Sequence, residues 1–378
     1  MTIVQIKQEL KDKGISHKGI TKKQELLNLI PTYRTARERQ GYLTERGIYW
    51  LKINIANLYG YDKLTFDDRI TKANEILDNP SLFLEQEAES PIEFRNALED
   101  YQTHLRGEAV ESIMYLDCSN QALQLYAVLT SDKKTAELCN LANGNDIADA
   151  YKIVADTMNR ESDLTIFNRD NCKKAVMTTL YSKANVGETI KEADLAITEE
   201  AEEINELFQH SFNIVAPEAK EAMEALLSLN NEDKGVYYWS MPDNFQVKYD
   251  VKSKHDIHIQ GQSKEGIHLE FNQTVKRYAP SEHNRGMSPN IIHSFDGYIV
   301  REIERQFNHF FTSIHDAFGV HYNYIDELRE IYINILCDIN TKDYLKPIME
   351  QVSLTQHNTL KKNTLSNEDI RTSVYYLS

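Results

Sequence analysis

Two aspartates that follow short apolar runs constrain the fold of this chain more than any other feature. Asp117 directly follows the apolar residues 114–116, and Asp316 follows the largely apolar run 310–314 and one histidine. Runs of this length predict buried strands rather than helices, so each carboxylate is expected at a strand end. The two aspartates are 199 residues apart, and only folding can bring them together. Each one alone is also compatible with a turn or a helix cap.

Length and composition indicate a globular chain. A chain of 378 residues usually forms two or three domains. Its 41% apolar and 26% charged residues are typical of folded proteins. No apolar run is long enough to span a membrane, and the N-terminus has no apolar signal core. Four cysteines without CxxC spacing argue against a disulfide framework and a zinc site, so we expect a cytoplasmic protein.

The net charge of −16 does not by itself favour nucleic acid as a partner. The charge is unevenly distributed, since residues 1–50 carry ten Lys or Arg and five Asp or Glu. Because binding depends on the local surface rather than on the total, the net charge does not exclude a nucleic-acid enzyme.

Periodicity predicts an α+β fold that is mostly helical. Helices are expected over 47–110, 121–138, 146–160, 169–182, 188–230 and 288–311. Alternating patterns over 235–278 predict strands. The expected architecture is therefore a helical protein with a small antiparallel sheet that carries acids at its strand ends.

The predicted helix at 169–182 carries a pattern suited to a nucleotide. Arg169, Lys173 and Tyr181 fall near one helical face and present two cations and an aromatic hydroxyl. Cations suit the oxygens of a triphosphate, and an aromatic ring suits the sugar and base. A solvated basic face is the alternative interpretation.

The order of these elements resembles that of template-directed polymerases with a right-hand shape. An aspartate, then Arg-x3-Lys-x7-Tyr, then His-Asp follow one another along the chain. The details are similar to the single-subunit RNA polymerases of phages and mitochondria, through the segments GIYWLKINIANLYGYDK at 47–63, KAVMTTLYSK at 174–183, PNIIHSFDG at 289–297 and HDAFG at 315–319. The resemblance runs from 47 to 378, and the last ten residues are similar in placement to the family's aromatic C-terminal foot. Together these motifs are highly specific.

The resemblance implies a domain order. Residues 47–137 would form the first part of the palm, 138–289 the fingers, and 290–378 the second part of the palm with the foot. Residues 1–31 resemble the SAP motif, a helix–loop–helix that binds duplex DNA, although a helical hairpin packed on the body is the alternative. Residues 32–46 would be a linker.

The resemblance also implies a metal site. Asp117 and Asp316 would hold two Mg²⁺ ions, with the Cys118 carbonyl as a third ligand. Hard oxygen ligands select magnesium, and a pair of such ions stabilises the attacking and leaving oxygens of a displacement. His315 would contact the primer end.

A nucleotide site is implied as well. Arg169 and Lys173 would contact the triphosphate, Tyr181 the incoming sugar, and His293 the newly formed base pair. A satisfied structural histidine is the alternative for both His293 and His315.

Three positions depart from the family pattern. Ser182 stands where the family has glycine, which makes the backbone there less free. Cys118 also replaces a glycine, and Ala317 replaces a common serine. None of these departures removes an essential charge.

Two residues favour ribonucleotides. The related DNA polymerases place a glutamate five residues after the first aspartate, where it collides with a ribose 2′-hydroxyl, and commonly a second one after the last aspartate. This chain has Ala122 and Ala317 at those positions. A DNA polymerase remains the alternative enzyme. A non-catalytic DNA-binding protein is a further alternative that leaves the motifs unexplained.

The resemblance predicts partners. DNA template, RNA product and ribonucleoside triphosphates are expected. The family's Asp-x-x-Gly-Arg motif does not occur in these 378 residues. We therefore expect a second polymerase subunit with the N-terminal and thumb regions, as in the split phage polymerases, and a single-stranded-DNA-binding helper. The expected location is the cytoplasm of an infected bacterium.

Overall fold

A computed structural model describes residues 41–378 together with 7, 10 and 11, except 84, 163, 195, 196, 198, 232, 263–267 and 279–284. For 252–262 and 268–278 it describes the backbone only. Apart from residues 7, 10 and 11, the SAP-like segment predicted at 1–31 lies outside the described residues, as does most of the linker predicted at 32–46. The chain divides into two compact units. The first comprises Met1–Asp117, Phe307–Glu330 and Ser378, and the second comprises Cys118–Gln306 and Ile331–Leu377.

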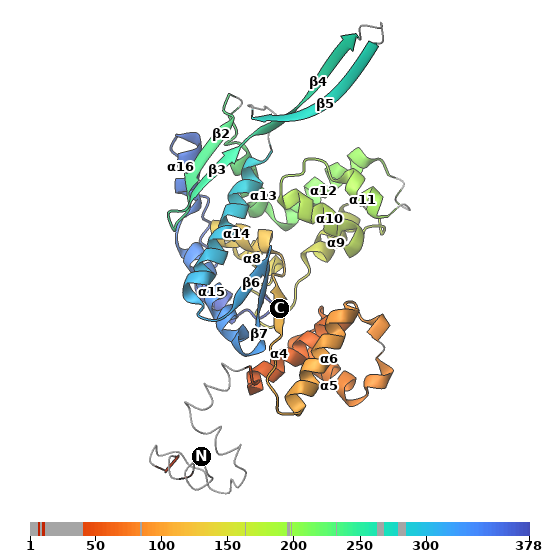
Figure 1. The fold of residues 1–378 in the computed structure, drawn as a ribbon. Helices are drawn as coiled ribbons and strands as arrows, with labels where there is room; N and C mark the ends of the chain where they lie inside the picture. Colours follow the sequence, from red (N-terminus) through yellow and green to blue (C-terminus); the bar gives the residue numbers. More distant parts are fainter. Residues whose placement is uncertain are drawn as a thin grey trace. The chain divides into compact units, whose positions relative to one another are not determined.

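Three helices form most of residues 47–110 in the first unit, which confirms the helical prediction for this range. They are α4 (Glu45–Ala56), α5 (Phe66–Asp78) and α6 (Pro91–Leu105). The hydroxyls of Thr44 and Thr65 cap α4 and α5, and Pro91 opens α6. Helices α5 and α6 both pack against α4 (Figure 1). Short helical turns join them, namely the π-helix η1 (Asn57–Tyr61) and the 3₁₀ turns η2 (Pro80–Leu82) and η3 (Glu85–Glu87).

An ion-pair cluster fixes the start of α15 (Ile325–Thr341) against α4 within the first unit. The Asp326 carboxylate accepts hydrogen bonds from Arg46 at 2.6 and 2.8 Å and from the Trp50 indole at 2.9 Å. Burial alone would raise the pKa of Asp326, but these donors outweigh it and lower that pKa. The cluster therefore stabilises the helices beside the sheet of this unit.

The first unit also contains a three-stranded antiparallel sheet in the order β1-β7-β6. Its strands are β1 (Ile113–Asp117), β6 (Phe311–Ile314) and β7 (Ala317–His321), and the 3₁₀ turn η4 (Tyr322–Tyr324) follows. The strands predicted before the two aspartates are confirmed. Strand β7 was not predicted, because only His315 and Asp316 separate it from β6, and this pair lacks the glycine that usually marks a two-residue hairpin turn.

The two faces of this sheet differ. Met114, Leu116, Phe318 and Val320 are at most 1% exposed, whereas the alternating residues Tyr115 and Asp117 face solvent. The central strand must carry glycine opposite Tyr115. A Cβ atom at Gly319 would lie 2.8 Å from both the Tyr115 ring and the Thr312 methyl group.

Gly319→Ala is therefore expected to lower the free energy of unfolding by about 1–3 kcal/mol, because the added methyl overpacks the sheet. Chemical denaturation would measure this. Gly297→Ala is the matched control, since its added methyl group would meet a single atom of the Arg301 side chain at 3.2 Å. This looser contact, in a helix that favours alanine over glycine, should cost less than the two contacts at Gly319. Equal stability of Gly319→Ala and the unaltered chain would contradict the steric account.

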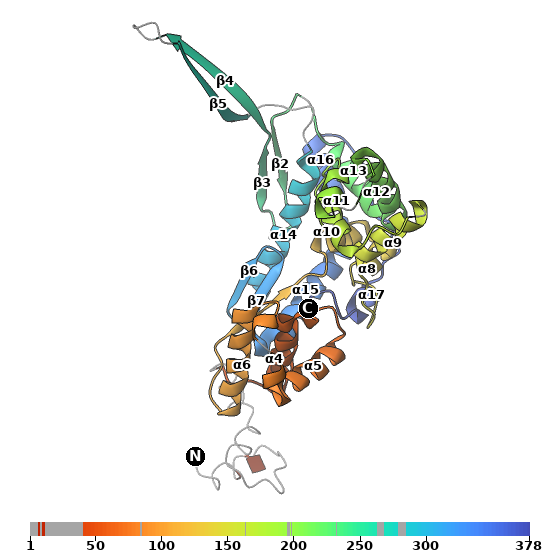
Figure 2. The same cartoon turned by 90° about the vertical axis from the view of Figure 1, so that its right-hand side faces the viewer.

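The second unit is mostly helical. Helix α7 (Gln121–Thr130) is buried at every residue and forms its core. Helices α9 to α12 form one group (Figure 2). The predicted helical region 188–230 is divided, because α11 ends at Ala193 and Pro217 begins a new helix. The remaining helices up to residue 227 are α8 (Lys133–Leu138), α9 (Ala150–Ser162), α10 (Arg169–Leu180), α11 (Gly187–Ala193), α12 (Ala201–Val215) and α13 (Pro217–Leu227).

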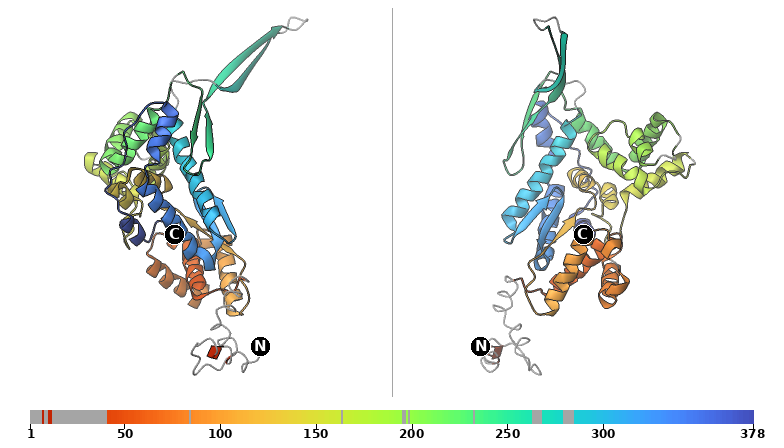
Figure 3. Two further views of the ribbon diagram at one scale, coloured as in Figure 1. Left: turned by 90° about the vertical axis from the view of Figure 1, so that its left-hand side faces the viewer. Right: turned by 45° about the vertical axis from the view of Figure 1, so that its right-hand side comes forward.

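Strands follow at 235–278, as predicted. They form two hairpins, β2 (Val236–Ser240) with β3 (Gln246–Asp250) and β4 (Lys252–Gln262) with β5 (His268–Tyr278). The next helix, α14 (Met287–Gln306), is one continuous helix, drawn in light blue in Figure 3, and ends five residues before the predicted end. Helices α16 (Leu345–Ser353) and α17 (Asn367–Thr372) complete the described elements. None of the helices among the residues that the structure describes is long and apolar enough to cross a membrane.

A buried carboxylate ties the β2–β3 turn to α14. The side chain of Asp243 is 2% exposed and accepts hydrogen bonds from Arg301 at 2.6 and 3.1 Å and from Arg305 at 3.1 Å. The hydrogen bond from Arg301 is the main reason why the pKa of Asp243 falls from 3.8 to about 2. This pair holds the first hairpin of the second unit in place.

Asp243→Asn is expected to lower the free energy of unfolding near pH 7 by about 2 kcal/mol. Because the folded-state pKa lies below the unfolded value, the carboxylate stabilises the fold above about pH 4, and this contribution disappears as the pH falls towards 2. Urea unfolding at several pH values should show that the free energies of unfolding of Asp243→Asn and of the unaltered chain converge at low pH. Asp233→Asn, at an exposed aspartate, should leave the free energy of unfolding nearly unchanged. A loss of stability in Asp243→Asn that does not vary with pH would contradict the assignment.

Candidate active site

The fold brings the two aspartates of the sequence analysis to one end of the sheet in the first unit. Asp117 is the last residue of β1, and its register partner is Ala317, the first residue of β7. Asp316 directly precedes Ala317, and paired strands lie about 4.8 Å apart. Asp117 is exposed and Asp316 is half-buried. Two carboxylates from distant parts of the chain are therefore close neighbours at a solvent-accessible sheet end.

A tight turn fixes Asp316 at this position. Ile314 pairs with Ala317, so His315 and Asp316 alone form the loop of the β6–β7 hairpin. His315 has φ of 55°, in the left-handed region that residues other than glycine seldom occupy. Its side chain is exposed. The imidazole is therefore presented to solvent beside the carboxylate.

The end of β1 is also paired along its other edge. The Asp117 amide donates to the Ser378 carbonyl at 3.3 Å, and the Ser378 amide donates to the Asp117 carbonyl at 3.1 Å. The next residue, Cys118, has its thiol buried 3.2 Å from the Tyr332 hydroxyl. The thiol of Cys118 therefore packs in the core, which leaves only its backbone carbonyl as a ligand.

The donor set fits magnesium. Among the described residues there is no group of three or more His, Cys, Asp or Glu side chains that could hold a metal ion. Mg²⁺ usually keeps several waters and is held by one or two carboxylates together with substrate phosphates. The exposed pair Asp117 and Asp316 suits that mode of binding.

In the second unit, α10 carries the predicted cations. Asn168 caps the helix with a capping box, which fixes the backbone of Arg169 at the first helical position. The Arg169 guanidinium donates to Asp149 at 2.6 Å and lies 3.3 Å from Asp170. Lys173, one turn further on, is exposed. Arg169 is thus already oriented by carboxylates, which the local pattern did not predict.

Tyr181 and His293 meet at the other end of α10. The helix ends at Leu180, so Tyr181 lies just beyond it, and Ser182 takes a left-handed φ of 71°. The rings of Tyr181 and His293 are stacked, with their centroids 4.8 Å apart and their planes 9° apart. The His293 Nδ1 atom lies 3.1 Å from the Asp296 carboxylate. Two residues predicted to contact the nucleotide therefore stack on each other, with the His293 ring exposed and Tyr181 half-buried.

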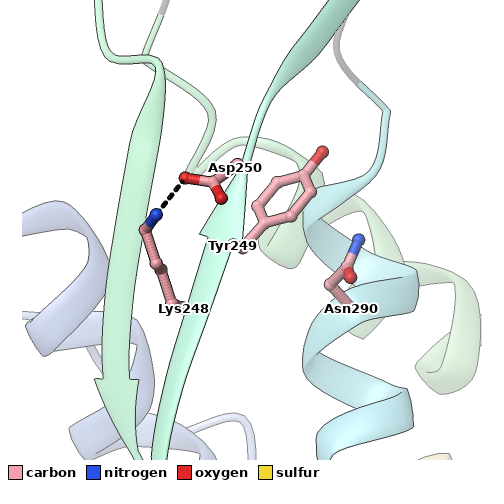
Figure 4. A pocket seen from close by; sticks show the side chains of 4 residues that line it. All are labelled: Lys248, Tyr249, Asp250 and Asn290. Atoms are coloured by element: carbon pink, nitrogen blue, oxygen red, sulfur yellow. Dashed lines mark ion pairs between the residues drawn. The ribbon is translucent and has the colours of Figure 1, made fainter. Parts of the chain in front are cut away.

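An open hollow of about 450 Å³ borders the helix that carries His293. Lys248, Tyr249 and Asp250 of β3 line it together with Asn290, one helical turn before His293 (Figure 4). Lys248 and Asp250 form an ion pair at 2.9 Å. The hollow therefore has polar walls without net charge, unlike the cationic face expected for a triphosphate.

Two contacts of the predicted residues in the second unit were not themselves predicted. Asp149 holds Arg169 from 20 residues away, and Asp296 contacts His293. Asp296 could have been found within the 289–297 motif, three residues after His293 and hence on the same helical face. Asp149 could have been predicted as a helix cap, because it accepts from the amides of Tyr151 and Lys152, but its bond to Arg169 has no local signal.

The sequence of the chain is similar to those of known RNA polymerases. The sequence profile of the DNA-dependent RNA polymerase family matches residues 42–194 and 186–375. Mitochondrial DNA-directed RNA polymerase 1 of Arabidopsis thaliana is 26% identical over 365 residues, covering 82% of this chain and 36% of the relative. The DNA-directed RNA polymerase of Pseudomonas phage phiKMV is 24% identical over 349 residues, covering 76% and 42%.

The chain thus spans little more than a third of the mitochondrial relative and about two fifths of the phage one. The family match nevertheless covers nearly all of the described residues and includes both aspartates, the α10 motif and His293. This confirms the resemblance drawn from the motifs and the predicted α+β fold. The chain belongs to the DNA-dependent RNA polymerase family.

Proposed function

We propose that this chain catalyses DNA-templated addition of ribonucleotides to the 3′ end of a growing RNA. The convergence of Asp117 and Asp316 at one sheet end, in a chain of this family, carries the proposal. In-line nucleotidyl transfer requires negative ligands where the attacking hydroxyl and the triphosphate meet. This sheet end provides such ligands with access to solvent.

Asp117 and Asp316 would hold two Mg²⁺ ions, with the Cys118 carbonyl as a further donor. When bound, such ions neutralise phosphate charge and favour the ionised form of the attacking hydroxyl. His315, exposed in the β6–β7 turn, would contact the 3′ end of the RNA and orient it. The two-residue loop of the β6–β7 hairpin would keep the His315 and Asp316 backbones next to each other.

The residues of α10 and α14 would bind the incoming nucleotide. Arg169 and Lys173 would contact the triphosphate oxygens, and the stacked Tyr181 and His293 would contact the sugar and the new base pair. Charge-assisted hydrogen bonds from a guanidinium suit phosphate oxygens. Asp149 would keep the Arg169 fork oriented.

Selection of ribonucleotides would depend on the space near Tyr181. Ala122 lies in the first turn of α7, one turn before Tyr126 and so on the same helical face. The Tyr126 hydroxyl reaches the Leu180 carbonyl, next to Tyr181. A small residue on this face leaves room for a 2′-hydroxyl. A related DNA polymerase is the second candidate, and Ala122 and Ala317 both disfavour it.

We further propose that a second chain supplies the contacts of the template–product duplex, because no Asp-x-x-Gly-Arg motif occurs in these residues. The setting would be phage transcription in the cytoplasm of an infected bacterium, with a single-stranded-DNA-binding helper. Co-expression with candidate phage proteins, followed by affinity purification, tests this proposal. Full activity of this chain alone on a primed template would contradict it.

The enzymatic proposal is tested by extending a labelled RNA primer on DNA templates that differ at one position. The full chain, with any co-purifying polypeptide, is supplied with one ribonucleotide at a time. Addition of only the complementary ribonucleotide would support templated RNA synthesis. Addition that ignores the template base would contradict it.

A further inference from the structure

The backbone on both sides of Tyr181 is held by side chains from other elements of the second unit. The Leu180 carbonyl lies 3.4 Å from the Tyr126 hydroxyl, and the Ser182 carbonyl accepts from Arg285 Nε at 2.7 Å. His293 stacks on the ring itself. Tyr181 lies beyond the end of α10. The backbone carbonyls of both its neighbours and its own ring are nevertheless held by contacts with other elements.

The first of these restraints is a buried relay. Tyr126 and Ser288 are both 0% exposed, and their hydroxyls lie 2.9 Å apart. With Ser288 donating to Tyr126, the phenol can donate to the Leu180 carbonyl, so both hydroxyl protons are satisfied. Burial raises the pKa of Tyr126, so the phenol stays protonated as a donor. The relay thus links α7, the end of α10 and the start of α14.

The second restraint compensates for an unfavourable backbone. Ser182 has a left-handed φ of 71° and is 3% exposed. A residue other than glycine in this conformation persists only when its surroundings hold it there. The hydrogen bond from Arg285 to its carbonyl provides such a constraint.

We propose that Tyr126, Ser288 and Arg285 are positioning residues that set the place of Tyr181 and thereby the preference for ribonucleotides. This inference rests on the proposed function, in which the Tyr181 hydroxyl meets the ribose 2′-hydroxyl. A hydrogen bond to one sugar hydroxyl discriminates only while its donor stays within a few tenths of an ångström of its place. Substitutions that remove the hydrogen bonds of these three residues would lower sugar selectivity while Tyr181 itself is kept.

The test measures the ratio of kcat/KM for a ribonucleotide to that for the matching deoxyribonucleotide. Tyr126→Phe and Arg285→Gln are each expected to lower the ratio on the order of three- to tenfold, the equivalent of one hydrogen bond. Tyr126→Phe combined with Ser288→Ala should have no more effect than Tyr126→Phe alone, because both changes remove the same bond. Arg285 lies at the surface, so its variant remains informative if Tyr126→Phe does not fold.

Tyr237→Phe is the matched control. Tyr237 is 0% exposed in the same unit, and its hydroxyl bonds the backbone of Asn231 instead. This control should be less stable than the wild-type chain but should keep its ratio of kcat/KM values for the two nucleotides. Unchanged ratios in Tyr126→Phe and Arg285→Gln, with a wild-type chain that prefers ribonucleotides, would overturn this inference alone. A wild-type chain without that preference would overturn the proposed function, and this inference with it.

Discussion

Asp316→Asn is expected to reduce ribonucleotide incorporation by about 10³-fold or more while the chain stays folded. The asparagine amide keeps the size of the side chain and removes the charge that a divalent cation requires. Asp316 lies in a two-residue turn and is half-buried, so an asparagine of the same size should be accommodated there. Asp117→Asn should have the same effect, because each aspartate supplies one part of a shared site.

Single-nucleotide addition with Mg²⁺ measures this loss, and circular dichroism with thermal unfolding verifies the fold. Asp67→Asn is the matched control, since Asp67 is an exposed aspartate on α5 of the same unit and should retain full activity. Substantial activity of Asp316→Asn at ordinary Mg²⁺ concentrations would contradict the assignment of the metal site.

Tyr181→Phe is expected to lower the preference for ribonucleotides over deoxyribonucleotides by about tenfold, with a smaller change in kcat for ribonucleotides. The ring stacked on His293 is kept, so the sugar loses only a hydrogen bond. The kcat/KM for deoxyribonucleotides, which lack the 2′-hydroxyl, should stay the same or rise.

Competition between the two nucleotide types on one template measures the preference directly. Tyr238→Phe is a suitable control, because its ring is 57% exposed on β2 and lies outside the proposed site. Unaltered selectivity in Tyr181→Phe would show that another group senses the 2′-hydroxyl.

Local sequence patterns predicted the elements that carry the site. The apolar runs before Asp117 and His315 are short and bounded, which is typical of buried strands, and they form β1 and β6. Strand β7 escaped prediction because its turn uses His315 at a positive φ instead of glycine or asparagine. The acidic stretch predicted as helical over 188–230 forms three helices. Pro217 fixes the second of the two breaks, which amphipathic periodicity alone does not reveal.

Motifs along the chain predicted the candidate site residues, whereas contacts that depend on the tertiary structure were missed. The aspartates and the Tyr181–His293 pair come from motifs whose order along the chain is informative. Tyr126 meets Ser288 across 162 residues, and a tyrosine in an apolar helix looks like an ordinary core residue. Such contacts are properties of the packed fold, and no local spacing encodes them.

The most direct test of the central claim is single-nucleotide addition to an RNA primer on a DNA template. The full chain, purified with whatever polypeptide binds it, would be given Mg²⁺ and either the complementary ribonucleotide or its deoxy counterpart. Rapid, Mg²⁺-dependent addition of the ribonucleotide, lost in Asp316→Asn, is the predicted result. Preferential addition of the deoxyribonucleotide would contradict the claim and identify a DNA polymerase instead.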